Sequence, residues 1–314
     1  MNPIKVCFLG TPAFAAVHLK FLLNLPAYKV VGVVTQPDRP TGRKMLLTPS
    51  VVKLTALENS LPVLTPENLR KETGAFETIK SWQADVAIVV AFGQILSQEF
   101  LDSFKYGAVN IHGSLLPKWR GAAPIQRSLE AGDTEGGVTL QKMVKKLDAG
   151  AIIGERKIKI NNEDTATELY DRLAVLGCEL LETALLDSIK GAVQPVEQDE
   201  SKVTIATKIE KSESLLNWKM SAREIHNRVR AFTMGPGTYV MFQGKRLKIR
   251  STKVLDENST GIPGVIVAAD EASLLVQTGA GQISVLEVQP ESKSRMTVTD
   301  FLKATEIKKG DMFV

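Results

Sequence analysis

The chain reads Ala-Val-Asn-Ile-His-Gly-Ser-Leu-Leu-Pro over residues 108–117. A mostly apolar run that reaches a glycine and then a proline is typical of a β-strand that turns into a loop. On such a strand Asn110 and His112, two residues apart, project from the same face. In α/β proteins, functional residues collect where the parallel strands end. This stretch therefore predicts an α/β fold with a polar site at the end of residues 108–112.

A carboxylate farther along the chain completes a candidate site. Asp148 lies in Leu-Asp-Ala-Gly-Ala at residues 147–151. Taken singly, a His at a strand end is usually structural, and an Asp before Ala-Gly is usually a turn residue. Taken together, an amide donor, an imidazole and a carboxylate that orients the ring are suited to acyl transfer. We therefore treat Asn110, His112 and Asp148 as candidate catalytic residues.

Strand-like and helix-like segments alternate over the first 190 residues. Apolar runs predict strands at 4–9, 29–34, 85–91, 108–112, 137–143 and 152–160, and helical spacing predicts helices at 13–25 and 165–188. Thr165 and Glu168 have the spacing of a capping box at the start of the second helix. This alternation predicts a Rossmann-like, mostly parallel sheet with helices on both faces.

The pattern changes after residue 190. Residues 191–201 are polar, contain Pro195 and lack a clear period, which indicates a linker. Short β-like runs at 239–241, 245–253, 264–268, 273–277 and 282–288 follow one helical segment near 221–231. About five strands in roughly 75 residues fit a small β-barrel, for which the oligonucleotide-binding type is one candidate. We predict a catalytic domain at 1–190, a linker at 191–207 and a C-terminal β-barrel (OB-like) domain at 208–314.

Positive charge is concentrated in the second part of the chain. Residues 1–200 carry 22 Lys and Arg against 23 Asp and Glu, whereas residues 208–253 carry 11 basic and 3 acidic residues. Such a cluster suits a polyanion such as a nucleic acid, and it is equally compatible with a solvated surface that has no partner.

Cysteine, histidine and apolar content exclude several classes of protein. Two cysteines without a Cys-x-x-Cys pair, and three histidines, support neither a disulfide framework nor a metal site. No apolar run approaches the roughly 18 residues of a membrane span. The N-terminus lacks the cationic region and cleavable apolar core of a secretory signal. The sequence thus predicts a reduced, cytoplasmic protein without a metal and without a membrane partner.

Three short motifs resemble those of the folate-dependent formyltransferases. They are Asn-x-His at 110–112, Ser-Leu-Leu-Pro at 114–117 and Asp-x-Gly at 148–150. Residues 119–126 (Trp-Arg-Gly-Ala-Ala-Pro-Ile-Gln) and 35–43 (Thr-Gln-Pro-Asp-Arg-Pro-Thr-Gly-Arg) are similar to those members of the family that formylate initiator methionyl-tRNA. The resemblance covers essentially the whole chain. It implies transfer of the formyl group of 10-formyltetrahydrofolate, a co-substrate, to the α-amine of initiator methionyl-tRNA in translation initiation.

The resemblance also implies roles for particular residues. Asn110 and His112 would stabilise negative charge on the formyl oxygen, and Asp148 would orient His112 and relay the proton of the amine. The residues implied to border the folate are Phe92, Gly93, Ile95, Leu96, Ser114, Leu115, Leu116 and Pro117. Ordinary core and loop packing explains any single one of these eight residues equally well.

A long polar loop at 37–53 is implied to contact the tRNA acceptor end, although most loops of this kind are mobile surface. Lys44-Met45-Leu46-Leu47 stands where many relatives have a Gly followed by paired lysines, so apolar Met45 or Leu46 is expected to pack on the tRNA end. The basic residues assigned to tRNA binding are Arg39, Arg43, Lys44, Lys208, Arg246 and Lys248.

Other functions stay open from the sequence alone. The same site could formylate a small amine, such as an amino sugar or glycinamide ribonucleotide. A non-catalytic RNA-binding protein could retain the fold, but it would not need the set Asn110, His112 and Asp148. Hydrolysis of the donor is disfavoured by the basic second domain. The expected partners are initiator methionyl-tRNA and a folate, and we expect a monomer.

Overall fold

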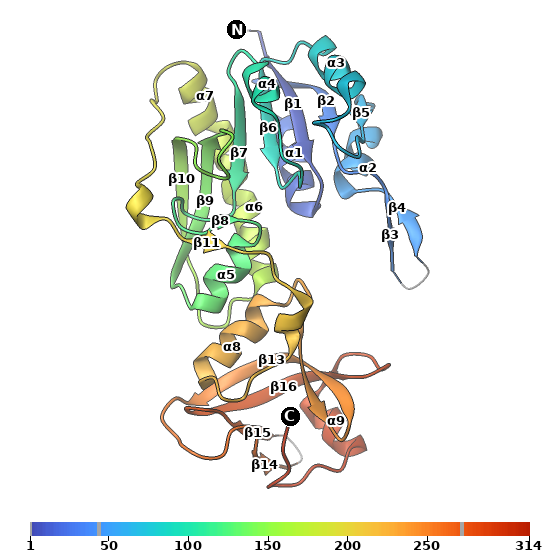
Figure 1. Ribbon diagram of the computed structural model, residues 1–314, viewed down its shortest axis with the longest axis vertical. Coiled ribbons are helices and arrows are strands. Elements are labelled where there is room, and N and C mark those ends of the chain that lie inside the picture. The colour runs from blue at the N-terminus through green and yellow to red at the C-terminus, as the bar shows by residue number, and fades with distance from the viewer. Residues whose placement is uncertain (1, 43–44, 271–272) are drawn as a thin grey trace. The chain divides into compact units, whose positions relative to one another are not determined.

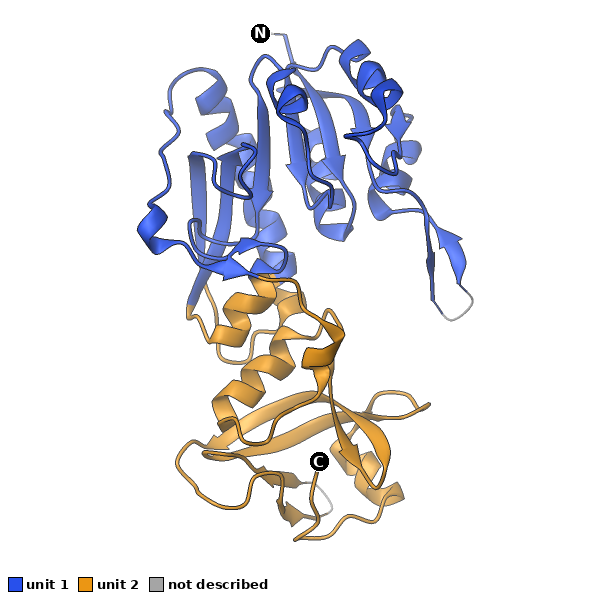
Figure 2. Ribbon diagram, viewed as in Figure 1, with its two compact units in different colours: residues 1–124, 135–158, 170–206 blue, residues 125–134, 159–169, 207–314 orange. Residues whose placement is uncertain are grey.

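The computed structural model describes residues 2–42, 45–270 and 273–314, and these residues form two compact units (Figures 1 and 2). Unit 1 contains the residues up to Pro124, Glu135–Ile158 and Tyr170–Ala206. Unit 2 contains Ile125–Thr134, Lys159–Leu169 and Thr207–Val314. Two short segments from earlier in the chain therefore group with the C-terminal residues.

Strands and helices are interspersed along the chain up to residue 206. The strands are β1 (Ile4–Gly10), β2 (Tyr28–Val34), β3 (Arg39–Thr41), β4 (Leu46–Thr48), β5 (Val63–Leu64), β6 (Val86–Val90), β7 (Ala108–His112), β8 (Arg120–Gly121), β9 (Glu135–Lys142), β10 (Ile152–Lys159) and β11 (Ile205–Ala206). The helices are α1 (Ala13–Leu23), α2 (Val51–Glu58), α3 (Thr73–Ser81), α4 (Gln98–Asp102), α5 (Pro124–Ala131), α6 (Ala166–Glu182) and α7 (Ala184–Ile189), and a 3-10 turn spans Glu200–Lys202.

The described part of unit 1 is built on a seven-stranded sheet with the order β10-β9-β7-β6-β1-β2-β5 (Figure 1). β6, β1, β2 and β5 run parallel, β7 is parallel to β6, and β9 is antiparallel to β7. All five residues of β6 are buried, as the continuous apolar run predicts. The predicted α/β class with a mostly parallel sheet is therefore confirmed.

The helix predicted over 165–188 begins as expected but divides in two. The Thr165 and Glu168 side chains form the capping box, with backbone nitrogens 2.8 and 3.3 Å from the opposing side-chain oxygens. The break falls at Thr183, whose hydroxyl donates to the carbonyl of Glu179 over 2.7 Å and accepts from Arg156 over 3.2 Å. A threonine that bonds back to the preceding turn bends a helix, which explains the boundary between α6 and α7.

Two segments predicted as a loop and a linker have regular structure. Residues 39–48 include the antiparallel hairpin of β3 and β4, in which Pro40 pairs with Leu47. In the segment predicted as a linker, β11 pairs in parallel with β8, so that Ile205 lies opposite Arg120 and Ala206 opposite Gly121. A side chain on Gly121 would collide with the carbonyl of Ala206, and this close approach requires glycine.

The C-terminal residues form β12 (Thr238–Phe242), β13 (Lys245–Asp256), β14 (Ile266–Ala269), β15 (Leu274–Gln277), β16 (Gln282–Pro290), β17 (Met296–Thr297), α8 (Ala222–Ala231) and α9 (Val298–Ala304), after a 3-10 turn at Lys211–Ser214. The described strands make an antiparallel sheet in the order β12-β13-β16-β15-β14, with β17 on β16. The sequence predicts an OB-like β-barrel here, and the presence of a C-terminal β domain is confirmed, with an antiparallel sheet.

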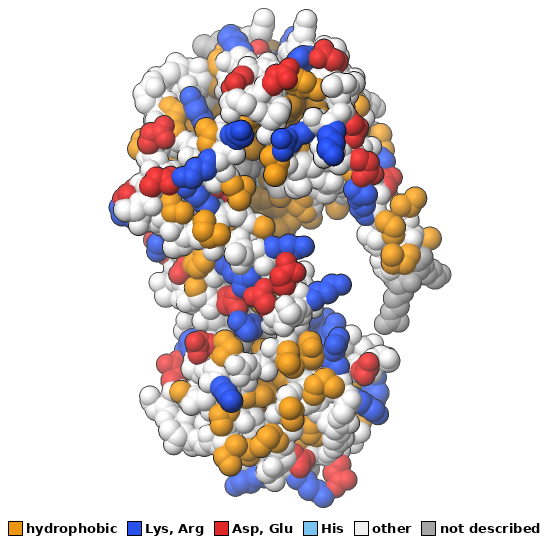
Figure 3. All heavy atoms as spheres, viewed as in Figure 1, with side chains coloured by type: hydrophobic (Ala, Val, Ile, Leu, Met, Phe, Trp, Pro, Cys, Tyr) orange, Lys and Arg blue, Asp and Glu red, His pale blue; other side chains and the backbone are white. Residues whose placement is uncertain are grey.

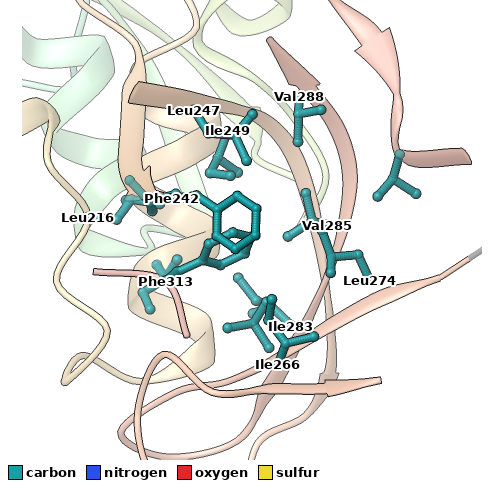
Figure 4. Packing of buried hydrophobic residues seen from close by; sticks show 14 of the residues in the cluster. Leu216, Phe242, Leu247, Ile249, Ile266, Leu274, Ile283, Val285, Val288 and Phe313 are labelled. Atoms are coloured by element: carbon teal, nitrogen blue, oxygen red, sulfur yellow. The ribbon is translucent and has the colours of Figure 1, made fainter. Parts of the chain in front are cut away.

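Alternate residues of these strands build the core of unit 2. Leu247, Ile249, Val285 and neighbouring apolar side chains converge on Phe313 near the C-terminus (Figure 4). Phe313 stacks on Trp218 with ring centroids 5.7 Å apart and meets Phe242 edge to face. Helix α8, capped by Ser221 and Glu224, covers β13. The opposite side of β13 is left for polar and basic residues.

Candidate active site

The candidate site lies at the carboxyl end of β7. Asn110 and His112 share one face of this strand, and Asn110 lies opposite Val89 of β6 and Gln141 of β9. The Nδ1 atom of His112 is 3.8 Å from Oδ2 of Asp148. The side chains of His112 and Asp148 are only 7% and 12% exposed. The structure thus brings together the imidazole and the carboxylate that the sequence places 36 residues apart.

The other ring nitrogen of His112 fixes the orientation of the imidazole. Nε2 lies 2.9 Å from the carbonyl oxygen of Trp119. A carbonyl oxygen only accepts, so Nε2 carries the hydrogen of this bond. Nδ1 is consequently the nitrogen that faces Asp148, at a distance longer than a direct hydrogen bond. A proton on Nδ1 would make the ring cationic beside a carboxylate.

Two donors hold the carboxylate of Asp148. The backbone nitrogen of Gly121 lies 2.9 Å from Oδ2, and Nε2 of Gln141 lies 3.2 Å from Oδ1. Asp148 itself has a left-handed backbone with φ of 48°. Asp is one of the few residues that adopt this region without a large penalty. The carboxylate is therefore held from two sides.

Sequence reasoning missed Gln141, Trp119 and Gln198 as parts of this site. Gln141 is 1% exposed although it is polar, and it follows Thr139 by two residues on the same face of β9. A run of Thr-Leu-Gln inside an apolar strand is a signal that could have drawn attention to it. Trp119 contributes through its backbone carbonyl, which no side-chain pattern reveals.

The loop after β6 begins at the same edge of the sheet. The carbonyl of Phe92 accepts hydrogen bonds of 3.1 Å from Thr11 and from Gln36, which ties this loop to the ends of β1 and β2. Phe92 and Leu96 are buried, whereas Gly93 is exposed and Ile95 is 70% exposed. The loop thus combines a fixed apolar base with an exposed rim.

The Ser-Leu-Leu-Pro loop is anchored by Thr139. The Thr139 hydroxyl donates to the carbonyl of Ser114 over 2.7 Å and accepts from the backbone of Leu116 over 3.0 Å. The Ser114 hydroxyl donates to the carbonyl of Lys118, so it is engaged within the loop. Leu116 is buried, and Leu115 and Pro117 are half-buried. Burial also raises the pKa of Glu155, whose Oε1 lies 3.2 Å from the Thr139 hydroxyl oxygen.

The β3–β4 hairpin presents an apolar surface. Met45, Leu46 and Leu47 are 66%, 64% and 72% exposed, and hydrophobic side chains are visible on the hairpin in Figure 3. Arg39 forms an exposed ion pair with Glu67 over 2.7 Å. Arg43 and Lys44, which the sequence assigns to tRNA binding, lie outside the described residues. The described tip of the hairpin is therefore dominated by apolar side chains.

A basic and aromatic face covers β12 and β13. Leu247 and Ile249 point into the core, so Arg246 and Lys248 lie on the other face of the strand. The guanidinium of Arg246 lies 4.1 Å from the centroid of the Tyr239 ring, and Tyr239 pairs with Lys248 across the strands. Lys208 is also exposed. Arg230, by contrast, is 6% exposed and donates to the backbone carbonyls of Asn161 and Asp164, which makes it structural.

Residues 2–42, 45–270 and 273–314 contain neither a metal-binding cluster nor a membrane-spanning helix. In those ranges no group of three or more His, Cys, Asp and Glu side chains is arranged to hold a metal ion. No helix there is long and apolar enough to cross a membrane.

Comparisons with known proteins show the family of this chain. Residues 4–185 match the family model described as "Formyl transferase", and residues 208–306 match "Formyl transferase, C-terminal domain". The fold and the site thus define an enzyme of the formyltransferase class. The chain is 56% identical to the methionyl-tRNA formyltransferase of Bdellovibrio bacteriovorus over 99% of both chains, and 40% identical to that of Bacillus subtilis over 98% of this chain and 97% of the other. It belongs to the methionyl-tRNA formyltransferase family.

Solved structures share the fold at lower identity. An N-formyltransferase from Helicobacter canadensis, in complex with folinic acid and dTDP-3-aminofucose, aligns with a TM-score of 0.68 at 22% identity and covers 91% of this chain and 99% of its own. HypX from Aquifex aeolicus, in complex with tetrahydrofolic acid, aligns with a TM-score of 0.63 at 16% identity over 99% of this chain and 50% of its own. Folate compounds are bound in both of these neighbours.

Proposed function

We propose that this enzyme transfers the formyl group of 10-formyltetrahydrofolate to the α-amine of initiator methionyl-tRNA. The observation that carries the proposal is the His112–Asp148 pair at the end of β7, with Asn110 on the same strand face. The chain that contains these residues is 56% identical to a methionyl-tRNA formyltransferase over 99% of both chains. The reaction is attack of a neutral amine on the formyl carbon and loss of the folate N10.

Asn110 and His112 would stabilise the charge that develops during attack. As the amine nitrogen bonds to the formyl carbon, negative charge grows on the formyl oxygen. The Asn110 amide can donate to that oxygen, and His112 with a proton on Nδ1 adds positive charge next to it. The bond from Nε2 to the Trp119 carbonyl keeps the ring in place during this step.

Asp148 would handle the proton that the amine releases. The new amide nitrogen must lose one proton, and N10 must gain one when the carbon–N10 bond breaks. A carboxylate held beside His112 can accept the first proton and return it, directly or through a water molecule. The donors Gly121 and Gln141 keep this carboxylate oriented without consuming all its acceptor capacity.

The two loops beside β7 fit a pterin ring. A pterin needs apolar contact on its faces and backbone hydrogen bonds along its edge. Phe92, Leu96 and Leu116 provide buried apolar side chains, and the left-handed residues Ala91 and Gly93 redirect the backbone of the first loop. We assign Phe92, Gly93, Ile95, Leu96 and residues 114–117 to the folate site.

Two surfaces would bind the tRNA, one on each unit. The face with Arg246, Lys248 and Tyr239 suits phosphates and stacked bases. The exposed Leu46 and Leu47 of the hairpin suit an unpaired end of the acceptor stem, where base faces are open to apolar contact. Arg39 and Lys208, and the basic Arg43 and Lys44, would add contacts to phosphates. We propose that the enzyme acts in the cytoplasm as a monomer.

Single-turnover formyl transfer tests the proposal. Methionyl-initiator tRNA and methionyl-elongator tRNA are compared with 10-formyltetrahydrofolate as donor, using the intact enzyme and Asn110→Ala. We expect transfer to the initiator alone and a loss of about 100-fold or more in the variant, the usual effect of removing an oxyanion donor. Consumption of the donor without formylation of either tRNA would contradict the proposal.

A further inference from the structure

The last segment of unit 1, residues 191–206, places a buried side chain next to the candidate active site. Gln198 is 9% exposed, whereas Gln194, Val196 and Glu197 in the same segment are exposed. A polar side chain is buried at little cost only where its donors and acceptors are satisfied. Both ends of the Gln198 amide are satisfied by residues around Asp148.

The oxygen of the Gln198 amide accepts from Arg120. Oε1 lies 3.0 Å from Nε and 2.8 Å from an Nη atom of Arg120, which is 2% exposed. Arg120 also donates to Glu200 over 2.8 Å, and Glu200 accepts from Lys146 over 2.7 Å. These two cations lower the pKa of Glu200 to about 2. Arg120 is therefore held between two residues of the segment 191–206.

The nitrogen of the same amide donates toward the loop of Asp148. Nε2 lies 2.8 Å from the carbonyl oxygen of Asp148, 2.8 Å from that of Gly150 and 3.3 Å from Oε1 of Gln141. Reversing the amide would place an oxygen against three acceptors and a nitrogen against a guanidinium. The network thus admits one orientation of Gln198.

These contacts act on a residue with a left-handed backbone conformation. Asp148 has φ of 48°, and the carbonyls of residues 148 and 150 on either side of Ala149 converge on one donor. Gln141, which donates to the Asp148 carboxylate, is in the same network. The direction of the Asp148 side chain depends on this backbone, because the left-handed conformation turns the carboxylate toward His112.

We propose that Gln198 is a positioning residue that holds Asp148 in line with His112, so that residues 191–206 of unit 1, predicted from the sequence as a linker, contribute to the active site. This inference rests on the role proposed above for Asp148. Gln198 touches no substrate in this account, and it acts through the backbone of residues 148–150. A displacement of about 1 Å at a catalytic group can lower the rate by as much as about 100-fold.

Two substitutions test the amide oxygen and the amide nitrogen of Gln198. Gln198→Leu removes both atoms. Gln198→Glu keeps an oxygen for Arg120 but replaces the donor with a second carboxylate oxygen, which faces the carbonyls of Asp148 and Gly150. Gln194→Leu is the matched control, because it makes the same change at an exposed position of the same segment.

We expect kcat to fall about 10- to 100-fold in both Gln198 variants, with KM for tRNA and for the formyl donor changed less than about threefold. The Gln198→Glu variant has a further signature. Protonation of its carboxylic acid restores a donor, so its kcat relative to the intact enzyme rises as the pH is lowered toward 5.5. A role in stability alone would lower the melting temperature and leave kcat per folded enzyme and its pH profile unchanged.

The controls distinguish the possible failures. If the intact enzyme does not formylate tRNA, the proposed function is wrong. If it does and Asp148→Asn is fully active, the role of Asp148 is wrong. If Asp148→Asn is impaired while both Gln198 variants match Gln194→Leu in kcat and pH profile, the inference about Gln198 is wrong. If the leucine variant does not fold, the nearly isosteric glutamate variant gives the decisive pH profile.

Discussion

Nε2 of Gln141 lies 3.2 Å from Oδ1 of Asp148, while Oδ2 of the same carboxylate is the oxygen near His112. One buried amide on β9 thus occupies the side of the carboxylate that faces away from the imidazole. The chemistry of Asp148 is consequently sensitive to a residue that is not expected to touch either substrate.

Replacing Gln141 by Glu would introduce a second carboxylate at this contact. Two carboxylates so close disfavour ionisation of the pair, so we expect the acidic limb of the kcat/KM profile to move to higher pH by about one unit or more. The shift is measured from kcat/KM for the formyl donor between pH 5.5 and 9, with tRNA at saturating concentration. Gln141→Met, of similar size and uncharged, should lower the rate without moving the limb in this way. An unshifted limb in Gln141→Glu would show that Asp148 does not control it.

The apolar hairpin predicts a contact to tRNA that salt does not weaken. Changing Leu46 and Leu47 to Ser should reduce affinity for initiator tRNA by about 10-fold, since each exposed leucine loses apolar contact. The slope of log K against log salt should stay constant, because no counterion is released by these side chains. Leu57→Ser on α2, also exposed, is the control. Equal affinities of the hairpin variant and this control would rule out the contact.

Arg246 and Lys248, unlike the hairpin leucines, are expected to make contacts to tRNA that salt weakens. Arg246→Gln and Lys248→Gln are each expected to weaken binding of initiator and elongator tRNA equally and to reduce the salt slope by about one. Filter binding between 50 and 300 mM salt, that is roughly sixfold in concentration, resolves this change. Lys309→Gln, at an exposed position of unit 2 away from β13, serves for comparison. A salt slope identical to that of the intact enzyme would show that Arg246 and Lys248 do not contact the tRNA.

Buried His18 predicts a pH dependence of stability. Its pKa falls from 6.5 to about 4 because burial disfavours the charged ring, whose Nδ1 donates to the carbonyl of Phe14 over 2.7 Å. The folded state therefore binds fewer protons than the unfolded state between these values. The contribution of His18 to the free energy of unfolding is complete above about pH 6.5. It is lost as the pH falls toward 4, by about 3 kcal/mol in total.

Urea unfolding at pH 7.5, 6.0 and 5.0 measures this effect. His18→Gln remains neutral throughout and keeps an N–H for Phe14, so its midpoint should depend less on pH than that of the intact protein. Parallel decreases in the two proteins would assign the pH dependence to other groups.

Sequence predicts the parts of the fold in which one local signal dominates. The strand at 108–112 has the predicted bounds because apolar residues and the following glycine agree. The division of the helix at Thr183 depends on a bond to Arg156 from β10, which only the folded chain brings near. The hairpin at 39–48 lies in the segment 37–53, which contains Pro37, Pro40 and Pro49, and strand propensity there is weak.

Some residues of the candidate site could likewise be predicted from the sequence, and others could not. Asn110, His112 and Asp148 are visible in the sequence because their chemistry and spacing are unusual for their elements. Gln198 gives no such signal, since a glutamine among polar residues is ordinary. Its importance follows from burial and from the convergence of three acceptors, which are properties of tertiary structure.

The pairing of β11 with β8 bears on how this enzyme could be cut and recombined. The composition changes near residue 190, which invites a fusion joint there for a chimaera with a foreign RNA-binding module. Such a joint would discard Gln198 and Glu200, together with the strand beside Arg120 and Gly121. The transferable piece instead runs through Ala206, so that any new module begins with the residue after it.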